Sequence, residues 1–582
     1  MPSQSSVESA GAQLAVYTWG DPTRPTVVLV HGYPDTHGCW DEVAQRLRDR
    51  LHVVAYDVRG MGRSSAPDRP DAFALDQLVR DLEAVIDAVS PDRAAHLVGH
   101  DWGAFQCWHA VTDPRVSPRI ASLTTIAGPR VDGARRWITD RLRPSPTALG
   151  ELAGQARRSW YVAAFQIPGL PEGVLRSGFA RSWPRMMRRL EGIEPRPGHP
   201  ADTLVSDAVA GLALYRVNLG PRAQLPWRGP ASVPVQVVIP TQDRYISPPL
   251  YSDAGNWAQR VWRRELRAGH WAQRSHPELM ARHVAELIEH AEGAPEPPAL
   301  RRARWPREGG WLGGRLAVVT GAGSGIGRAT TMALVGEGAE VIAADINPEA
   351  ARETIALAGG KAVHAMQVDV ADGAQMERWA AAVESEYGVP DIVVNNAGIG
   401  ISGPFLETTT EDWERILDVN LWGVIHGCRL FAEQMVRAGT EGHVVNLASL
   451  AAYMPSRALP AYSTTKAAVL MLSECLRAEL AGQGIGVSAI CPGVVSTNIV
   501  RTTHMVGVSA EDERRMQERA AGLYVRRGYG PEGVARAILK AIRGDEAVVP
   551  VTPESHIMLG LSRLSPAALR RLARVDGLSR VR

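Results

Sequence analysis

The chain is poor in lysine and cysteine and has no long apolar run. Only three of its 582 residues are lysine, whereas 61 are arginine, and its formal net charge is +2. A net charge so close to zero argues against a large surface that follows nucleic-acid phosphates. No apolar run is long enough to cross a bilayer, and the first residues lack the features of a secretion signal. We therefore expect a cytoplasmic protein that binds no nucleic acid.

The five cysteines argue against disulfides. They are odd in number, lie far apart and form no C-x-x-C motif, so we expect buried thiols in a reducing compartment. The histidines and carboxylates show no spacing typical of metal ligands, so we expect no bound metal.

Two α/β patterns are present, joined by an irregular segment. Residues 293–312 are rich in proline, arginine and glycine, which is typical of a partly extended linker. We expect a domain on each side of it, 1–292 and 313–560, and a basic tail over 561–582. Both domains should be parallel-sheet α/β folds, because short β-branched runs alternate with longer amphipathic ones. The expected strands are 26–30, 53–56, 95–98 and 233–239 in the first half and 316–320, 341–345, 391–395, 444–447 and 486–491 in the second.

The first half contains a pentapeptide that predicts a carboxylate nucleophile. GHDWG at 99–103 follows the expected strand 95–98, and its small flanking residues permit the strained turn of a nucleophile elbow. A carboxylate that attacked an ester would form a high-energy anhydride. Asp101 is better suited to a saturated carbon, in an epoxide or alkyl halide, where it forms an alkyl-enzyme ester.

Hydrolysis of that ester needs a base and an orienting acid, for which His270 and Asp243 are the candidates. Their order along the chain, with the nucleophile first and the histidine last, is that of α/β-hydrolases. The segment HGYP at 31–34 follows the expected strand 26–30, and its backbone N–H groups are candidates for an oxyanion hole.

These elements resemble the epoxide hydrolase branch of the α/β-hydrolase family over residues 10–290. The segment DVRGMGRS at 57–64 matches the family's D-x-R-G-x-G-x-S loop. The resemblance implies an α/β-hydrolase fold with a helical cap over about 130–225. It also implies two cap tyrosines, Tyr161 and Tyr215, that donate to the alkoxide of an opened epoxide.

Two alternatives to an epoxide hydrolase stay open. A haloalkane dehalogenase would use the same Asp101 and His270, with Trp102 as one halide donor. Tyr33 stands where a second halide donor is usual, and this departure, with the tyrosine pair, favours the epoxide. In the second alternative, the first half is an inactive module that binds substrate for the second half.

The second half contains a dinucleotide-binding fingerprint. TGAGSGIG at 320–327 follows a strand and opens an apolar helix, whose N-terminus suits a pyrophosphate. Asp345 ends the next strand, where a carboxylate binds the ribose 2′-hydroxyl and repels a 2′-phosphate. Ser324 supplies no cation for such a phosphate, so the expected cofactor is NAD rather than NADP.

Residues 313 to about 550 resemble the short-chain dehydrogenase/reductase family at nearly every signature. The resemblance implies a Rossmann doubly wound parallel sheet and a homo-oligomer. It implies the catalytic residues Asn420, Ser449, Tyr462 and Lys466. The implied cofactor-binding residues are Gly321, Ser324, Gly325, Ile326, Gly327, Asp345, Asp369, Val370, Asn396, Tyr462, Lys466 and Thr497.

The residue types of the catalytic set fit redox chemistry at a secondary alcohol or ketone. Hydride transfer at carbon needs proton transfer at oxygen, and a phenol requires a nearby cation to ionise near neutral pH. Lys466 lies one helical turn from Tyr462, and a planar guanidinium could not replace its compact ammonium. Ser449 would hold the substrate oxygen, and Asn420 would anchor a water that leads protons to solvent.

The two expected sites suggest consecutive reactions, in which an epoxide is opened to a diol and one hydroxyl is oxidised with NAD. The whole chain resembles bacterial two-domain proteins described as probable oxidoreductases, which implies lipid-type substrates. The tail over 561–582 contains six arginines and one aspartate. A basic amphipathic helix there would rest on an anionic membrane surface or bridge subunits, and the favoured interpretation is instead a solvated or frayed terminal helix.

Overall fold

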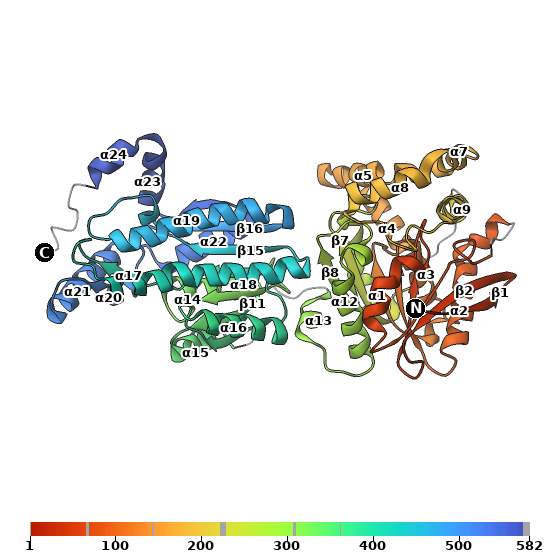
Figure 1. The fold of residues 1–582 in the computed structure, drawn as a ribbon, viewed down its shortest axis with the longest axis horizontal. Coiled ribbons are helices and arrows are strands. Elements are labelled where there is room, and N and C mark those ends of the chain that lie inside the picture. The colour runs from red at the N-terminus through yellow and green to blue at the C-terminus, as the bar shows by residue number, and fades with distance from the viewer. Residues whose placement is uncertain are drawn as a thin grey trace. The chain divides into compact units, whose positions relative to one another are not determined.

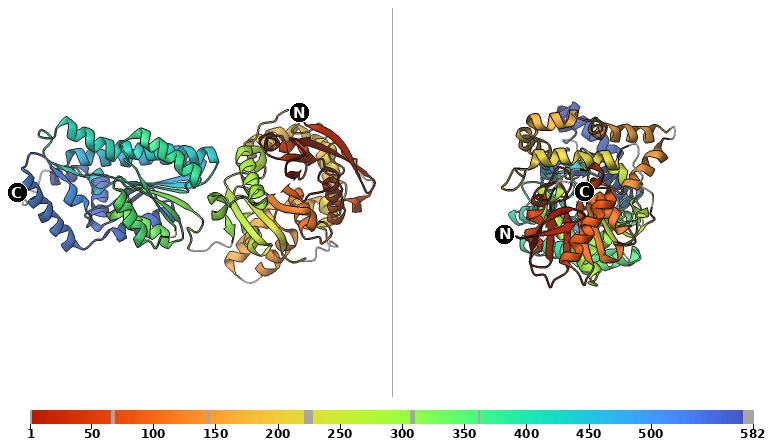
Figure 2. Two further views of the ribbon diagram at one scale, coloured as in Figure 1. Left: turned by 90° about the horizontal axis from the view of Figure 1, so that it is seen from below. Right: turned by 90° about the vertical axis from the view of Figure 1, so that its right-hand side faces the viewer.

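The computed structural model describes residues 2–65, 69–142, 145–220, 228–305, 310–360 and 362–573. It divides into two compact units, Met1–Pro306 and Arg307–Arg582, each built around its own sheet (Figures 1 and 2). Residues 221–225 of the expected cap, 306–309 of the expected linker and 574–582 of the tail lie outside the described residues. Within the described ranges, no helix has both the length and the apolar character needed to span a membrane.

A nine-stranded mixed sheet forms the centre of the first unit, in the order β1-β2-β4-β3-β5-β6-β7-β8-β9. Its interior strands are parallel: β3 (Thr26–Val30), β4 (His52–Tyr56), β5 (Ala95–His100), β6 (Ile120–Ile126), β7 (Ala231–Pro240) and β8 (Ala258–Leu266). Three outer strands pair antiparallel: β1 (Ser3–Ser9), β2 (Ala12–Trp19) and β9 (Arg304–Trp305). The expected parallel sheet is therefore confirmed for the interior strands, and the antiparallel outer strands were not predicted.

Helices cover both faces of this sheet. Val28 and Val30 of β3 pack in the core under α2 (Leu75–Val89) and α3 (Trp102–Val111). The alternate residues Val27 and Leu29 belong to a second core with α1 (Asp41–Leu47) and α12 (Pro277–Ala291). In the sequence, strands that are buried on both faces in this way appear as continuous apolar runs. A short helix, α11 (Ala272–Ser275), precedes α12.

The cap is inserted between β6 and β7. Its helices are α4 (Val131–Arg141), α5 (Pro146–Arg158), α6 (Trp160–Phe165), α7 (Leu170–Val174), α8 (Ala180–Met186), α9 (Leu204–Ala210) and α10 (Leu212–Asn218). Two π-helical turns, η4 (Leu175–Phe179) and η5 (Met187–Glu191), flank α8, and the chain bends within η4 at Gly178, whose backbone is not helical.

Part of the expected linker is regular structure. The helix α13 (Pro298–Arg302) and the strand β9 follow α12, and β9 pairs with β8. Leu300 is fully buried against Trp262 and Leu287. The first unit therefore continues beyond residue 292, because this one leucine anchors a proline-rich segment to the sheet.

The second unit contains a seven-stranded sheet in which every pair is parallel, in the order β12-β11-β10-β13-β15-β16-β18. Its strands are β10 (Leu316–Thr320), β11 (Glu340–Asp345), β12 (Val363–Gln367), β13 (Ile392–Asn395), β15 (Gly442–Leu447), β16 (Ile485–Cys491) and β18 (Val548–Pro550). A separate pair joins β14 (Ile401–Ser402) to β17 (His504–Met505). The doubly wound parallel sheet is confirmed.

Separate helix layers cover the two faces of this sheet. One core includes α16 (Gly373–Glu386), α18 (Gly423–Ala438) and α19 (Pro460–Leu480), and the other includes α14 (Gly325–Gly336) and α22 (Pro531–Gly544). The remaining helices are α15 (Pro348–Leu357), α17 (Thr410–Leu417), α20 (Ile499–Thr502), α21 (Ala510–Arg527), α23 (Pro553–Leu564) and α24 (Pro566–Leu572). Cys475, on α19, is exposed, so the expectation of five buried thiols is wrong for that residue.

Candidate active sites

Asp101 occupies a strained turn between β5 and α3. Its φ is 50° and its ψ is −119°, a region that non-glycine residues adopt at a cost of about 1–3 kcal/mol. A Cβ on Gly99 would lie 2.6 Å from Ala104 Cα, and one on Gly103 would overlap the Val30 carbonyl. Both glycines are therefore required, and the turn presents the Asp101 side chain at the end of the strand.

Backbone N–H groups donate to the Asp101 carboxylate. Oδ2 accepts a 2.9 Å hydrogen bond from the N–H of Tyr33, and the N–H of Trp102 also donates to this carboxylate. Oδ1 lies 3.8 Å from His270 Nε2. One carboxylate oxygen thus sits in an oxyanion-hole arrangement, and the other faces the histidine.

Asp243 orients His270. Its Oδ2 lies 2.8 Å from His270 Nδ1, and its Oδ1 accepts from the N–H groups of Tyr245 and Ile246 at 2.7 and 3.0 Å. Asp243 and His270 are both almost fully buried. The hydrogen bond at Nδ1 leaves Nε2 directed at Asp101. The structure therefore brings together the three residues that the sequence places in one site.

Burial and charge act against each other in this group. Burial raises the pKa of Asp101 to about 6, although His270 opposes the shift. Burial alone would lower the pKa of His270, but the carboxylates of Asp243 and Asp101 outweigh it and raise that pKa to about 9. At neutral pH, Asp101 and His270 are therefore predominantly a buried ion pair.

The two cap tyrosines converge near the nucleophile. The ring of Tyr215, on α10, lies 5.0 Å from that of Trp102, the residue after Asp101, and 5.9 Å from that of Tyr161, on α6. Burial, followed by the Asp101 charge among other causes, raises the pKa of the Tyr161 phenol. Burial, followed by the charges of Tyr161 and Asp101, does the same at Tyr215. Both phenols therefore keep their protons and can donate.

Glu191, which ends η5 in the cap, was not identified from the sequence. A Cβ on Gly269 would overlap its carboxylate, so this acid lies directly against the residue before His270. Both carboxylate oxygens are buried, and burial raises the pKa of Glu191 while the His270 charge opposes the shift. No motif surrounds Glu191, and only the folding of the cap onto the histidine loop reveals its position.

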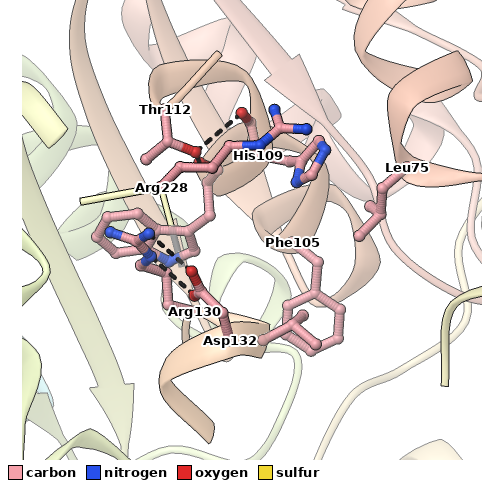
Figure 3. Close-up of a pocket in the computed structure, with 9 residues that line it drawn as sticks. Leu75, Phe105, His109, Thr112, Arg130, Asp132 and Arg228 are labelled. Carbon is pink, nitrogen blue, oxygen red and sulfur yellow. Dashed lines mark hydrogen bonds and ion pairs between the residues drawn. The ribbon is translucent and has the colours of Figure 1, made fainter. Parts of the chain in front are cut away.

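A small cavity in the first unit lies away from this group (Figure 3). Arg130 forms a bidentate pair with Asp132, at 2.9 and 2.7 Å. Arg228 and His109, which also line the cavity, both contact Asp76. The charged side chains of its described lining are thus already paired, so the cavity is not an anion site.

The loop after β10 and the first turn of α14 suit a dinucleotide phosphate. Ser324, the N-cap of α14, makes no capping hydrogen bond with its side chain. Gly325 has a φ of 51°, and a Cβ on Gly327 would overlap a backbone carbonyl of the loop. The helix N-terminus therefore keeps its N–H groups available for an anion. This segment contains the cofactor-binding candidates Gly321, Ser324, Gly325, Ile326 and Gly327.

Asp345, the last residue of β11, is placed for a ribose. Its Oδ2 accepts from Gly323 N–H at 2.8 Å and its Oδ1 from Asn347 N–H at 2.9 Å, so each oxygen keeps a lone pair. The next residue, Ile346, is exposed and uncharged. Arg328, on α14, is already engaged by Glu353. The Asp345 carboxylate is thus placed to accept from a ribose hydroxyl.

The other cofactor-binding candidates line the same end of the sheet. Asp369 Oδ1 accepts from a backbone N–H at 3.0 Å just after β12, and Val370 beside it is buried. Asn396 Nδ2 donates to the Thr320 carbonyl at 2.9 Å and so fixes the glycine loop. Thr497 lies against Gly325, 3.3 Å from where a Cβ would stand.

Tyr462 and Lys466 lie one turn apart on α19. Lys466 Nζ is 5.8 Å from the centre of the Tyr462 ring and donates to the Leu447 carbonyl at 2.8 Å. Burial lowers the pKa of Lys466 to about 8. With one donor engaged by the protein, the ammonium retains others for a ribose or a water.

Asn420 lies in the π-helical turn η8 (Asp418–Trp422), a distortion common at functional sites. Its side chain is held by the N–H and carbonyl of Ile399, at 2.8 and 3.0 Å. A Cβ on Gly398 would meet both Asn420 Oδ1 and Lys466 Nζ, at 3.1 and 3.5 Å, so these groups are neighbours. Ser449 begins the short helix η9 (Leu450–Ala452), which packs on α19.

Comparisons with known proteins agree with this division. Residues 25–277 match the alpha/beta hydrolase fold model and residues 315–505 the short chain dehydrogenase model. Over 578 residues, and 97% of each chain, the protein is 42% identical to "Probable oxidoreductase EphD" of Mycobacterium tuberculosis and Mycobacterium bovis.

Other relatives cover the second unit only. Sorbitol dehydrogenase from Cereibacter sphaeroides is 36% identical over 250 residues, which make up 41% of this chain and 95% of that protein. A crystal structure of a short chain dehydrogenase/reductase from Burkholderia phymatum in complex with NAD is 30% identical and covers 44% of this chain and 95% of its own, with a TM-score of 0.40. On its full-length similarity, the chain belongs to the family of oxidoreductases in which an alpha/beta hydrolase fold domain precedes a short chain dehydrogenase domain.

Proposed function

We propose that the first unit hydrolyses epoxides and that the second oxidises a secondary alcohol, or reduces the corresponding ketone, with NAD. The observation that supports the hydrolase most is the buried group of Asp101, His270 and Asp243 beside two protonated phenols. We place the substrates among lipid-like epoxides and alcohols and expect a homo-oligomer, in both cases from family resemblance.

Epoxide opening begins at Asp101 Oδ1, the oxygen that faces away from the backbone donors. Oδ1 attacks an epoxide carbon, the C–O bond of the ring breaks, and the alkoxide takes a proton from Tyr161 or Tyr215. The phenolate is reprotonated from solvent. The raised phenol pKa values support this role, because each tyrosine remains a donor at neutral pH.

Ester hydrolysis uses His270. Alkylation turns Asp101 into a neutral ester and removes one of the three carboxylate charges that raise the pKa of His270, those of Asp243, Asp101 and Glu191, so the imidazole becomes available as a base. It takes a proton from water, and the hydroxide attacks Asp101 Cγ. The N–H groups of Tyr33 and Trp102 stabilise the oxyanion. The alkyl oxygen leaves as a diol hydroxyl, protonated by His270.

In the second unit, Tyr462 exchanges the proton of the substrate oxygen. NAD, when bound, supplies the hydride acceptor. The Lys466 ammonium stabilises the Tyr462 phenolate, and Ser449 orients the substrate oxygen. Asn420, fixed by Ile399, anchors a water that connects Lys466 to solvent.

The two reactions fit in series, because the diol that the first unit would form carries a secondary hydroxyl, the group that the second unit would oxidise. Incubation with an aliphatic epoxide and NAD, with separate assays for diol and NADH, tests this proposal. We expect diol first and NADH after it. Diol without NADH would contradict the series. Diol formation at only the uncatalysed rate, unchanged by Asp101→Ala, would reduce the first unit to a binding module.

A haloalkane dehalogenase is the second candidate. Trp102 Nε1 is buried beside the Tyr215 phenol, and among the described residues it meets no acceptor in good hydrogen-bond geometry, so this indole is a candidate halide donor. Release of chloride from a chloroalkane, with no turnover of epoxides, would favour this activity.

A further inference from the structure

The cap exposes an unusual amount of apolar surface. Among the described residues of the first unit, every exposed large hydrophobic side chain lies in the cap segment 138–190. Trp160 is 68% exposed and Leu142 is 69% exposed, values far from those of core residues. The full set is Ile138, Leu142, Leu149, Trp160, Ile167, Leu170, Val174 and Leu190. Exposed apolar side chains confined to one segment in this way indicate an interaction surface on the cap.

The same segment is strongly basic. Residues 131–200 contain twelve arginines and six acidic residues, a surplus of six positive charges. The whole chain has a net charge of only +2, so the rest of the chain is net negative by four. The arginine content of the sequence therefore does not explain the cap, since elsewhere acidic residues balance the arginines.

Five of these arginines follow the path from η4 through α8 to η5. They are Arg176, Arg181, Arg185, Arg188 and Arg189. All five are exposed, and no acidic residue lies between Glu172 and Glu191. In the described structure only Arg188 of the five forms an ion pair, with Glu194 at 3.5 Å. Trp183 and Met187 of the same path are buried, so the arginines lie on its outer side.

We propose that the outer surface of the cap binds an anionic lipid bilayer. Guanidinium groups pair with lipid phosphates while neighbouring tryptophan, leucine and valine side chains enter the boundary of the acyl region. Figure 1 shows α5, α7 and α8 as an outer layer of the first unit, beyond the ends of β7 and β8. Lipid fits better than the other anionic or apolar partners. A second copy would oppose arginine to arginine, and a nucleic acid would leave the apolar side chains unused.

The surface and the candidate active site share one short helix. Trp160 and Tyr161 are consecutive on α6, and Trp160 is exposed whereas Tyr161 packs against Tyr215 and Tyr245. If the proposed epoxide hydrolysis holds, a lipid epoxide can pass from the bilayer to Asp101 across this helix. Membrane binding itself does not depend on that reaction.

Vesicle sedimentation of the full chain tests the proposal. At low salt, we expect the chain to sediment with phosphatidylcholine vesicles that contain phosphatidylglycerol and much less with phosphatidylcholine alone. Arg181→Gln with Arg185→Gln should weaken this binding roughly 25-fold, about fivefold per charge. Trp160→Ser should reduce the part of the binding that survives high salt, because salt screens charge but not apolar contact. The control is Arg24→Gln with Arg80→Gln, two exposed arginines outside the cap, and should bind like wild type.

Three results would overturn the proposal. They are no binding to phosphatidylglycerol vesicles, equal losses in the cap and control variants, and binding that disappears on deletion of 561–582 but not in the cap variant.

Hydrolysis of a water-soluble epoxide separates this proposal from the proposed function. We expect Arg181→Gln with Arg185→Gln to leave it unchanged, and a chain that binds vesicles but forms no diol would contradict only the hydrolase.

Discussion

The two candidate sites differ in how their buried charged side chains are stabilised. In the first unit, Asp101 and His270 are buried together, with Asp243 as a third member that hydrogen-bonds the histidine. In the second unit, Lys466 is buried and bonded to a backbone carbonyl, and the described residues place no carboxylate within ion-pair distance of it. The first site therefore contains a buried ion pair, whereas the second contains a buried cation with no carboxylate partner among the described residues.

Burial disfavours the charged form in both sites, but the charged groups have opposite sign. It raises the pKa of Asp101 to about 6 and lowers that of Lys466 to about 8. The hydrolase should therefore fail toward acid and the dehydrogenase toward base. Each activity can therefore be lost without the other, and five experiments test this.

Asp101→Ala should have the largest effect. Without a nucleophile, diol formation should fall by about 10⁴-fold or more, whereas NADH formation from a secondary alcohol should be unchanged. Steady-state assays of both products measure this. Asp140→Ala, at an exposed cap position, is the control and should retain diol formation. Parallel loss of both activities would show that the sites are not independent.

Tyr462→Phe should have the next largest effect, on the other product. Removal of the acid/base should lower NADH formation about 10³-fold and leave diol formation intact. Tyr387→Phe, on a partly exposed tyrosine at the end of α16, serves as the control. Retention of more than a tenth of the NADH rate would exclude Tyr462 as the proton carrier.

The pH profiles should then separate the sites. For the hydrolase, kcat/KM should fall about tenfold per pH unit below pH 6, because protonated Asp101 cannot attack. For ketone reduction, kcat/KM should fall as the pH rises above 8, because Lys466 loses its proton. Profiles with the same direction in both halves would contradict the comparison.

Tyr161→Phe and Tyr215→Phe should each have a smaller effect. Since one phenol remains in each variant, the rate of Asp101 alkylation should fall roughly tenfold, and the double variant should lose far more. Tyr251→Phe, a buried tyrosine of the same unit, is the matched control. Rapid-quench measurement of the alkyl-enzyme gives the rates. A double variant no slower than either single variant would remove these phenols from the mechanism.

Glu191→Gln should have the smallest effect. Its charge favours protonated His270, so its loss should lower the pKa of the histidine and shift the pH profile of ester hydrolysis toward acid, with roughly a two- to fivefold rate change. Glu194→Gln, three residues away and exposed, should not shift the profile. Identical profiles in all three proteins would mean that Glu191 is structural.

Local patterns predicted most of the fold. The strands 26–30 and 316–320 were predicted to the residue, because each is a short run of apolar and β-branched residues that is buried on both faces. The β1–β2 hairpin was missed, since SQSSVES is polar and mostly exposed. Its turn is Ala10-Gly11, both with positive φ, rather than the Asn-Gly pair that predicts such a turn.

The candidate site residues divide in the same way. Asp101, His270, Tyr462 and Lys466 lie in short motifs whose local geometry fixes their position, so the sequence was sufficient to propose them. Glu191 reaches the histidine loop only through the packing of the cap, and no local signal predicts that contact. The basic and apolar surface of the cap likewise depends on which side chains the fold leaves exposed.

The most direct test of the central claim, that Asp101 is alkylated and released by water, is a single turnover in ¹⁸O-labelled water. Water attacks Cγ of the ester in this account, so the label should appear in the peptide that contains Asp101, and the first diol should carry none from water. A labelled diol with an unlabelled peptide would mean that water attacks the epoxide directly and would contradict the account.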